Sequence, residues 1–350
     1  MRTTRRSLLL AAATLPALAA CSGGSDTGSA DGGAAGGSGA SDAGGTTTIE
    51  HIYGTTEIQG TPQRIATLSW VNADTLLALG VVPVAMPAVE WGGNANTSTD
   101  WIDAKLGELG AEWGSDTAPA QYSEADGVNF DEIAANTPDL IIGAYSGLTP
   151  EDYDKLSQIA PTIGPLAPDY TAAWDDVLLT IGTAVGKQDE ATALRDELTR
   201  SLAAAGEENP AVAASSFIAG NLDLPTGALT LYTAGDTRSR FFSALGMSLA
   251  DVVTKNTADE KTFSLEWSPE RADELDADVF YSWAAAGATV ESFQQHPMFG
   301  QIPAVKKGAL VLTADDHTTL AISALNALSI PWAIENIVPD VVSAAQTAQA

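Results

Sequence analysis

The chain alternates between short apolar runs and longer segments in which apolar residues recur every three or four positions. Short apolar runs that end in small or polar residues are typical of buried strands. Six such runs occupy residues 65–68, 140–142, 217–219, 229–232, 279–281 and 310–312. Helical patterns lie between them, for example at 73–79 and 130–134. This alternation predicts an α/β fold, with parallel sheet flanked by helices.

Two helical patterns follow one another in the middle of the chain, where the apolar runs stop. The first, at 174–185, places its apolar residues on one face, and Gly186 is a suitable C-terminal stop. The second covers 188–205 and is expected to end at Gly206 and Pro210. At 1.5 Å per residue it would be roughly 27 Å long, which is enough to connect two lobes.

We therefore expect two Rossmann-like α/β lobes joined by a long backbone helix, with a ligand cleft between the lobes. A single large α/β domain would seldom place two consecutive helices at its midpoint. The expected parts are an export signal at 1–21, a flexible linker at 22–48, a first lobe at 49–187, the backbone helix at 188–206 and a second lobe at 207–350.

The first 21 residues have the features of a bacterial export signal. Arg2, Arg5 and Arg6 precede an apolar stretch at 8–20, which is too short to span a bilayer. The twin arginines favour export by the Tat route over the Sec route, although a Sec signal can carry the same pair. The stretch ends in Leu-Ala-Ala-Cys, which resembles a lipobox, so Cys21 is expected to carry a lipid anchor to the cell membrane.

The composition of the chain bears on the linker and on the partners that the protein could bind. Residues 22–48 contain only Gly, Ser, Ala, Thr and Asp, so they have no apolar surface to offset the entropy of ordering. Loss of the three arginines in 1–21 takes the formal net charge from −29 to −32. Such acidity excludes nucleic acid as a partner, and contact with the membrane is expected through the lipid anchor only.

The mature part of the chain resembles the class III, or helical-backbone, periplasmic binding proteins, in their actinobacterial iron-siderophore branch. The matching segments are RIATLSW at 64–70, ALGVVPV at 78–84, NTPDLIIG at 136–143, IAPT at 159–162, ADV at 277–279, HPMF at 296–299 and IPAVKKG at 302–308. Their order and spacing are more specific than any single segment. The resemblance implies a monomeric, extracytoplasmic solute-binding protein that captures a ferric siderophore and delivers it to an ABC permease.

The ligand is expected beyond the carboxyl ends of the strands, where open α/β sheets bind their ligands. Aromatic and arginine residues follow the predicted strands. The candidates are Trp70, Tyr145, Trp283, His317, Arg238 and Arg240, with Trp91 in a loop rich in Gly and Asn. Aromatic rings can cover the organic rim of a siderophore, and an arginine fork can donate to its oxygens. Since Arg238 and Arg240 flank one serine, we expect at most one of them to face the cleft.

The resemblance also implies one acidic residue on each lobe that meets arginines of the permease. Glu270, in Ser-Pro-Glu, matches the second-lobe pattern, whereas the first lobe offers Asp131 or Glu132 in place of the usual glutamate. Each acidic position also suits a helix N-terminus, where it would stabilise the helix without contacting a partner.

Several alternatives remain open at this stage. The same fold binds haem or cobalamin, and Tyr145 and His317 could serve as haem ligands. A secreted hydrolase would belong to another class, but the chain has neither a Gly-x-Ser-x-Gly elbow nor a phosphate-binding loop, so we expect no enzymatic activity. The three histidines are too scattered for a metal site, and no cofactor is expected. The acidic body favours a hydroxamate over a trianionic catecholate ligand.

Overall fold

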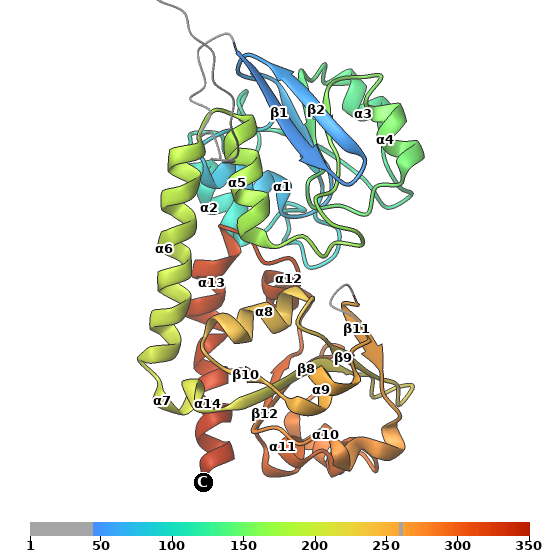
Figure 1. Cartoon of the computed structure of the whole chain (residues 1–350), viewed down its shortest axis with the longest axis vertical. Helices are drawn as coiled ribbons and strands as arrows, with labels where there is room; N and C mark the ends of the chain where they lie inside the picture. Colours follow the sequence, from blue (N-terminus) through green and yellow to red (C-terminus); the bar gives the residue numbers. More distant parts are fainter. Residues whose placement is uncertain (1–44, 259–261) are drawn as a thin grey trace, which may run out of the picture. The chain divides into compact units, whose positions relative to one another are not determined.

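The computed structural model describes residues 45–258 and 262–350, which belong to one unit (Figure 1). The expected export signal, Cys21 and most of the expected linker lie outside the described residues. We use "first lobe" for residues 45–187 and "second lobe" for residues 208–350. In the described part, no helix is both long enough and apolar enough to cross a membrane.

The first lobe contains a five-stranded, wholly parallel sheet in the order β5-β4-β3-β6-β7. The strands are β3 (Ile65–Thr67), β4 (Ala85–Pro87), β5 (Ala120–Tyr122), β6 (Leu140–Ile142) and β7 (Thr162–Ile163). The helices between them are α1 (Asn72–Ala78), α2 (Asp100–Glu108), α3 (Phe130–Ala135) and α4 (Pro150–Leu156). The chain reverses its direction of winding between β3 and β6, which places the ends of these two strands at the switch point of the sheet.

An antiparallel hairpin of β1 (Thr46–His51) and β2 (Gly54–Gln59) precedes this sheet. Strand β1 begins at Thr46, so the last residues of the linker expected at 22–48 belong to this hairpin. The residues of β1 show no apolar pattern that would predict a strand, because Ile49 is the only buried residue of β1. The hairpin is fixed to the first sheet by Thr56, whose hydroxyl donates to the backbone carbonyl of Thr162 at 2.5 Å.

Two consecutive helices, α5 (Trp174–Ala184) and α6 (Gln188–Glu207), follow the first sheet and pack on each other. The long helix α6 passes alongside both lobes, as Figure 1 shows. Helix α6 ends at Glu207, one residue after the expected stop at Gly206 and before Pro210. A Cβ atom at Gly206 would lie 1.8 Å from the carbonyl oxygen of Leu245, so glycine is needed for close approach between backbones.

The second lobe has a mixed sheet in the order β11-β9-β8-β12-β13, with β10 beside β8. The strands are β8 (Ser216–Leu222), β9 (Leu229–Tyr232), β10 (Ser248–Leu249), β11 (Ser264–Glu266), β12 (Val279–Trp283) and β13 (Leu310–Thr313). β8, β10, β12 and β13 are parallel, but β9 and β11 are antiparallel to their neighbours. The expectation of parallel sheet is therefore wrong for β9, because residues 223–228 form a short connection that returns the chain beside β8.

The remaining helices cover the second sheet and line its junction with the first lobe. They are α7 (Pro210–Ala213), α8 (Thr237–Ala244), α9 (Asp251–Asn256), α10 (Val290–Gln295), α11 (Pro303–Lys307), α12 (Asp316–Ser323), α13 (Ser329–Asn336) and α14 (Val338–Gln349), with 3-10 turns η1 (Pro269–Glu274) and η2 (Phe299–Gln301). One hydrophobic cluster runs continuously from Leu76 through Leu198 of α6 to Phe217 and Ile330. Bending the lobes apart would disturb this shared core, which favours a stiff junction.

Candidate functional site

Two adjacent cavities share the side chains of Trp70, Trp91 and Tyr170. The first-lobe cavity, about 230 Å³, is lined by Ser69, Trp70, Pro87, Ala88, Glu90, Trp91, Glu124, Ala125 and Tyr170. The inter-lobe cavity, about 200 Å³, is lined by Trp70, Trp91, Tyr145, Asp169, Tyr170, Thr171, Gly235, Asp236, Thr237, Arg238, Phe263, Leu320, Ser323 and Ala324. Of the five large apolar or aromatic side chains exposed in the described residues, four line the inter-lobe cavity.

Trp70 is presented to both cavities by a strained turn at the end of β3. Ser69 and Val71 have φ angles of 54° and 75°, which are unfavourable for residues other than glycine and most of all for β-branched valine. The turn persists because Asn72 donates through Nδ2 to the carbonyl of Leu68 at 2.6 Å. The indole is therefore left 39% exposed beside a rigid backbone.

Tyr145 and Tyr170 continue the aromatic surface from Trp70. The ring of Tyr170 lies 6.0 Å from that of Trp70 and 5.6 Å from that of Tyr145, between centroids. Asp169 and Tyr170 both have positive φ angles, in the irregular loop before α5. Tyr145 is buried, and this burial raises the pKa of its hydroxyl, which makes a long 3.5 Å hydrogen bond to the carbonyl of Ser323 in the second lobe.

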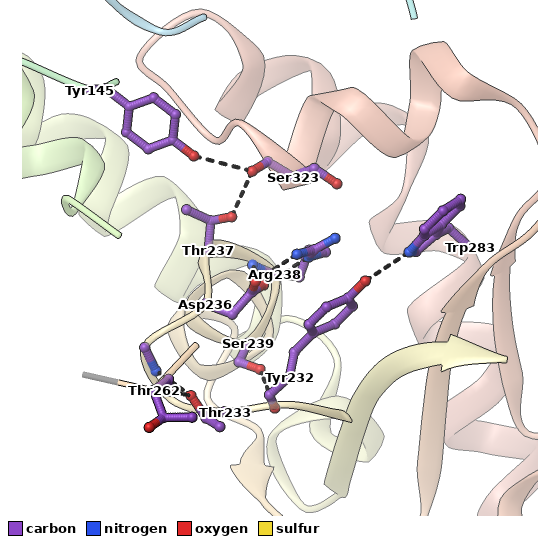
Figure 2. A network of polar contacts seen from close by, with 11 residues as sticks. Tyr145, Tyr232, Thr233, Asp236, Thr237, Arg238, Ser239, Thr262, Trp283 and Ser323 are labelled. Atoms are coloured by element: carbon purple, nitrogen blue, oxygen red, sulfur yellow. Dashed lines mark hydrogen bonds and ion pairs between the residues drawn. The ribbon is translucent and has the colours of Figure 1, made fainter. Parts of the chain in front are cut away.

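Arg238 is the cation of the inter-lobe cavity. Its Nε and Nη2 donate to Asp236 at 2.8 and 2.6 Å, and its guanidinium lies 3.5 Å from the ring centroid of Tyr232 (Figure 2). Burial acts against the charged form, but the hydrogen bonds of Asp236 outweigh it and raise the pKa of Arg238. Nη1 takes no part in this pair.

The position of Arg238 at the cavity does not depend on the end of a parallel strand, as the sequence had led us to expect. It follows β9, which is antiparallel to β8, so the rule for carboxyl ends of parallel strands does not place it. Its position is fixed by helix α8, where Asp236 is the N-cap and accepts a hydrogen bond from the backbone N–H of Arg238.

Trp283 does not line either cavity, contrary to the expectation from sequence. Its indole N–H donates to the hydroxyl of Tyr232 at 2.8 Å, and Tyr232 in turn stacks under Arg238 (Figure 2). Trp283 therefore orients the Tyr232 ring that lies against the guanidinium of Arg238, and it does not contact the cavity itself.

Arg240 and His317 also lie outside the two aromatic cavities. Arg240 donates through Nη1 to the carbonyl of Thr171 at 3.0 Å and so links the lobes. His317 lies 4.9 Å from Trp101 and 5.4 Å from Trp332, between ring centroids, and its Nδ1 is 2.8 Å from the carbonyl of Gly92. Because a carbonyl only accepts, this contact requires the proton on Nδ1.

Among the lining side chains that the sequence did not single out are Tyr170, Phe263, Glu90 and Glu124. Tyr170 follows β7, a strand of two residues whose pattern is too short to detect, so the strand-end rule could not be applied. Glu90 and Glu124 follow β4 and β5, whose residues, Ala-Met-Pro and Ala-Gln-Tyr, do not form an apolar run. Phe263 precedes β11 and carried no comparable signal.

The three expected docking carboxylates are all exposed on short helices. Asp131 and Glu132 lie in the first turn of α3, and Glu270 lies in the first turn of η1. Asn129 accepts from the backbone N–H of Glu132 at 3.3 Å, which confirms the N-cap. Across residues 45–258 and 262–350, no group of three or more His, Cys, Asp or Glu side chains is arranged to hold a metal ion.

Comparison with known families agrees with this architecture. A family model described as periplasmic binding protein matches residues 65–316. The chain belongs to this family. The probable siderophore-binding lipoprotein YfiY of Bacillus subtilis is 27% identical over 247 residues, which cover 67% of this chain and 68% of the relative.

Solved structures of periplasmic binding proteins show the same fold. PiaA of Streptococcus pneumoniae TIGR4, in complex with ferrichrome, has a TM-score of 0.78 and 28% identity, covering 86% of this chain and 99% of PiaA. SirA of Staphylococcus aureus, complexed with staphyloferrin B, has a TM-score of 0.66 and 25% identity, covering 85% and 99%. The resemblance to class III periplasmic binding proteins and the two-lobed α/β fold are thus confirmed.

Proposed function

We propose that this protein captures a ferric siderophore outside the cytoplasmic membrane and delivers it to an ABC permease. The observation that carries the proposal is the convergence of four exposed aromatic side chains on one cavity with a largely buried, oriented arginine. Apolar rings exposed together at a concave surface are typical of a binding site, since a folded chain otherwise buries them. The ligands named for YfiY, PiaA and SirA support the same class of ligand.

A hydroxamate siderophore suits the inter-lobe cavity better than a catecholate. Arg238 is the only cation among the residues that line it, and Asp236 neutralises most of that charge. A trianionic catecholate complex would need more positive charge, whereas a neutral or cationic trishydroxamate needs only a few donors for its oxygens. The formal charge of the chain, −29 for the full sequence, acts in the same direction.

Haem is a less suitable ligand because of where the candidate axial side chains lie. His317 is enclosed by Trp101 and Trp332 and does not line the cavity. Tyr145 lines it, but its hydroxyl is directed to the carbonyl of Ser323 in the second lobe. Neither arrangement offers an axial ligand to a planar iron porphyrin.

We infer a role in binding and release, without catalysis and without a resident cofactor, because the relatives are binding proteins. Asp131 or Glu132 on the first lobe and Glu270 on the second are proposed to meet arginines of the permease. Their exposure fits this role, since an exposed carboxylate can form an ion pair with a partner at low desolvation cost.

We also propose that the mature protein is a monomer, exported by the Tat route and held at the cell membrane by a lipid on Cys21. The family relationship to a lipoprotein supports the anchor. The twin arginines at positions 5 and 6 support the route. Membrane fractionation of wild-type and Cys21→Ala protein in cells would test the anchor, because the variant should be released into the soluble extracytoplasmic fraction.

The ligand is tested by titrating protein without residues 1–21 with ferrichrome, ferrioxamine B and a ferric catecholate, while tryptophan fluorescence is recorded. Because Trp70 and Trp91 line the cavities, a bound ferric complex should quench their emission at submicromolar ligand. The iron-free siderophores serve as controls. A lack of response to the whole panel, together with tight binding of haem or cobalamin, would contradict the proposal.

A further inference from the structure

The first-lobe cavity has a different chemistry from the inter-lobe cavity. Three aromatic side chains, Trp70, Trp91 and Tyr170, line it together with the carboxylates of Glu90 and Glu124. No lysine, arginine or histidine is among its lining residues in the described part of the chain. The cavity is therefore electronegative at its carboxylates and at the faces of its rings, whereas the inter-lobe cavity contains Arg238.

Only one of the two carboxylate oxygens of Glu124 accepts a hydrogen bond that holds the side chain in place. Its Oε2 accepts a hydrogen bond from the backbone N–H of Ser69 at 3.0 Å. Its Oε1 is shielded from solvent and lies near the hydroxyl of Tyr122, but that hydroxyl has one proton and donates it to the carbonyl of Thr67, so Oε1 receives no full hydrogen bond from the described residues. A buried carboxylate oxygen without a donor is costly, and a bound ligand that brings a donor would remove this cost.

Glu90 adds a second, exposed carboxylate to the same cavity. Its Oε1 accepts from the hydroxyl of Ser123 at 2.7 Å, a neutral partner that leaves its negative charge uncompensated. Two carboxylates beside three aromatic rings are the residue types that recognise ammonium groups, through ion pairing and cation–π attraction together. A neutral aromatic or alkyl group would use the rings but gain nothing from the carboxylates.

We propose that the first-lobe cavity binds an ammonium group carried on one arm of the siderophore, while the inter-lobe cavity holds the iron-bound hydroxamates. This inference rests on the proposed function and adds the charge of the preferred ligand. Trp70, Trp91 and Tyr170 line both cavities, so one ligand can lie across them and present its two chemistries to the two sides.

Ferrioxamine B and its N-acetylated derivative provide a matched pair of probes. Both are linear trihydroxamates with the same iron centre, but only ferrioxamine B ends in a primary ammonium group. We expect the ammonium form to bind about tenfold more tightly, the size of effect that one desolvated cation–π and carboxylate contact provides. Affinities are measured by fluorescence titration at fixed ionic strength and at a pH of about 8, where the carboxyl group of Glu124 is ionised.

The long-range field of an acidic protein would also favour the cation, so local variants are needed. Glu124→Gln and Glu90→Gln should each reduce the preference to about threefold or less, while affinity for the acetylated complex stays within about twofold. Glu57→Gln is the control, because Glu57 is exposed on β2 and does not line either cavity. It removes the same charge and should leave the preference for the ammonium form unchanged.

The outcomes separate the two proposals. Equal binding of both ferrioxamine complexes, or equal loss of preference in Glu57→Gln and Glu124→Gln, overturns the ammonium subsite and leaves siderophore binding intact. Failure of every ferric siderophore to bind overturns the proposed function and the subsite with it.

Discussion

Asn72 holds the backbone of Tyr145 at both of its polar groups. Its Nδ2 donates to the carbonyl of Tyr145 at 2.9 Å, and its Oδ1 accepts from the N–H of Tyr145 at 3.1 Å. The same Nδ2 also reaches the carbonyl of Leu68. One buried amide therefore joins the loops after β3 and β6, and it fixes Trp70 and Tyr145 relative to each other at the switch point of the first sheet.

Asn72→Ala should lower the free energy of unfolding by about 2–4 kcal/mol, because it leaves buried backbone groups of Tyr145 and Leu68 without partners. Urea denaturation followed by circular dichroism measures the change. Asn336→Ala is the matched control, since Asn336 is exposed and its side chain bonds only the carbonyl of Trp332 in its own helix. We expect that control within about 0.5 kcal/mol of wild type. Similar values for the two variants would contradict the bridging role of Asn72.

Arg238→Lys should weaken binding of ferrichrome by about tenfold or more, because lysine cannot keep the two-point pair with Asp236 and also offer a fixed N–H donor. The positive charge beside Asp236 is retained, so the variant should fold. Arg240→Lys is the control, since Arg240 contacts the carbonyl of Thr171 and lies outside the aromatic cavities. Its affinity should change by less than about threefold. Equal losses would place the ligand nearer to Arg240 than we propose.

Glu124 should make the protein less stable as the pH rises from about 4.5 to 7. Burial raises the pKa of Glu124 from its usual 4.5 to about 7, so in this range the folded state binds more protons than the unfolded state. Tyr122 is the neighbouring titratable group, and burial raises the pKa of its hydroxyl far above this range. The free energy of unfolding therefore falls with pH until Glu124 is ionised in both states.

Glu124→Gln should remove this dependence while keeping an acceptor for the Ser69 N–H. At a pH of about 8 we expect it to be roughly 1–3 kcal/mol more stable than wild type, after allowance for partial exposure, and nearly equal at a pH of about 4.5. Urea denaturation at both pH values tests this. Glu57→Gln, which changes an exposed carboxylate, should behave as wild type at both. A constant difference between Glu124→Gln and wild type across pH would show that ionisation is not its cause.

Gly206→Ala should destabilise the protein by about 1–3 kcal/mol, although alanine is the better helix former. The added methyl group would lie 1.8 Å from the Leu245 carbonyl and force α6 away from the C-terminal end of α8. Gly107→Ala in α2 is the control, because nothing lies within 4 Å of the place that a Cβ atom would take at Gly107. Thermal unfolding should show a higher Tm for Gly107→Ala and a lower one for Gly206→Ala.

The long, regular elements could be predicted because their apolar pattern persists over several turns. The apolar pattern at 188–205 predicted the long backbone helix α6, and the apolar runs at 229–232 and 310–312 predicted strands β9 and β13. The family resemblance and the position of Trp70 after a strand also followed from local sequence. Strands β4, β5 and β7 are as short as β3 and β6 or shorter, but they contain Pro, Gln or Thr and form no apolar run, so the side chains that follow them were missed.

By itself, the sequence determined the fold class, the helical connection and part of the site, namely Trp70, Trp91, Tyr145 and Arg238, since these depend on local patterns and residue types. Only the tertiary structure decided which side chains meet. Helix α8 and the antiparallel β9 bring Arg238 to the cavity and leave Trp283 behind Tyr232. Such choices depend on strand direction and on contacts between residues far apart in the chain, such as Tyr145 and Ser323, which no local pattern encodes.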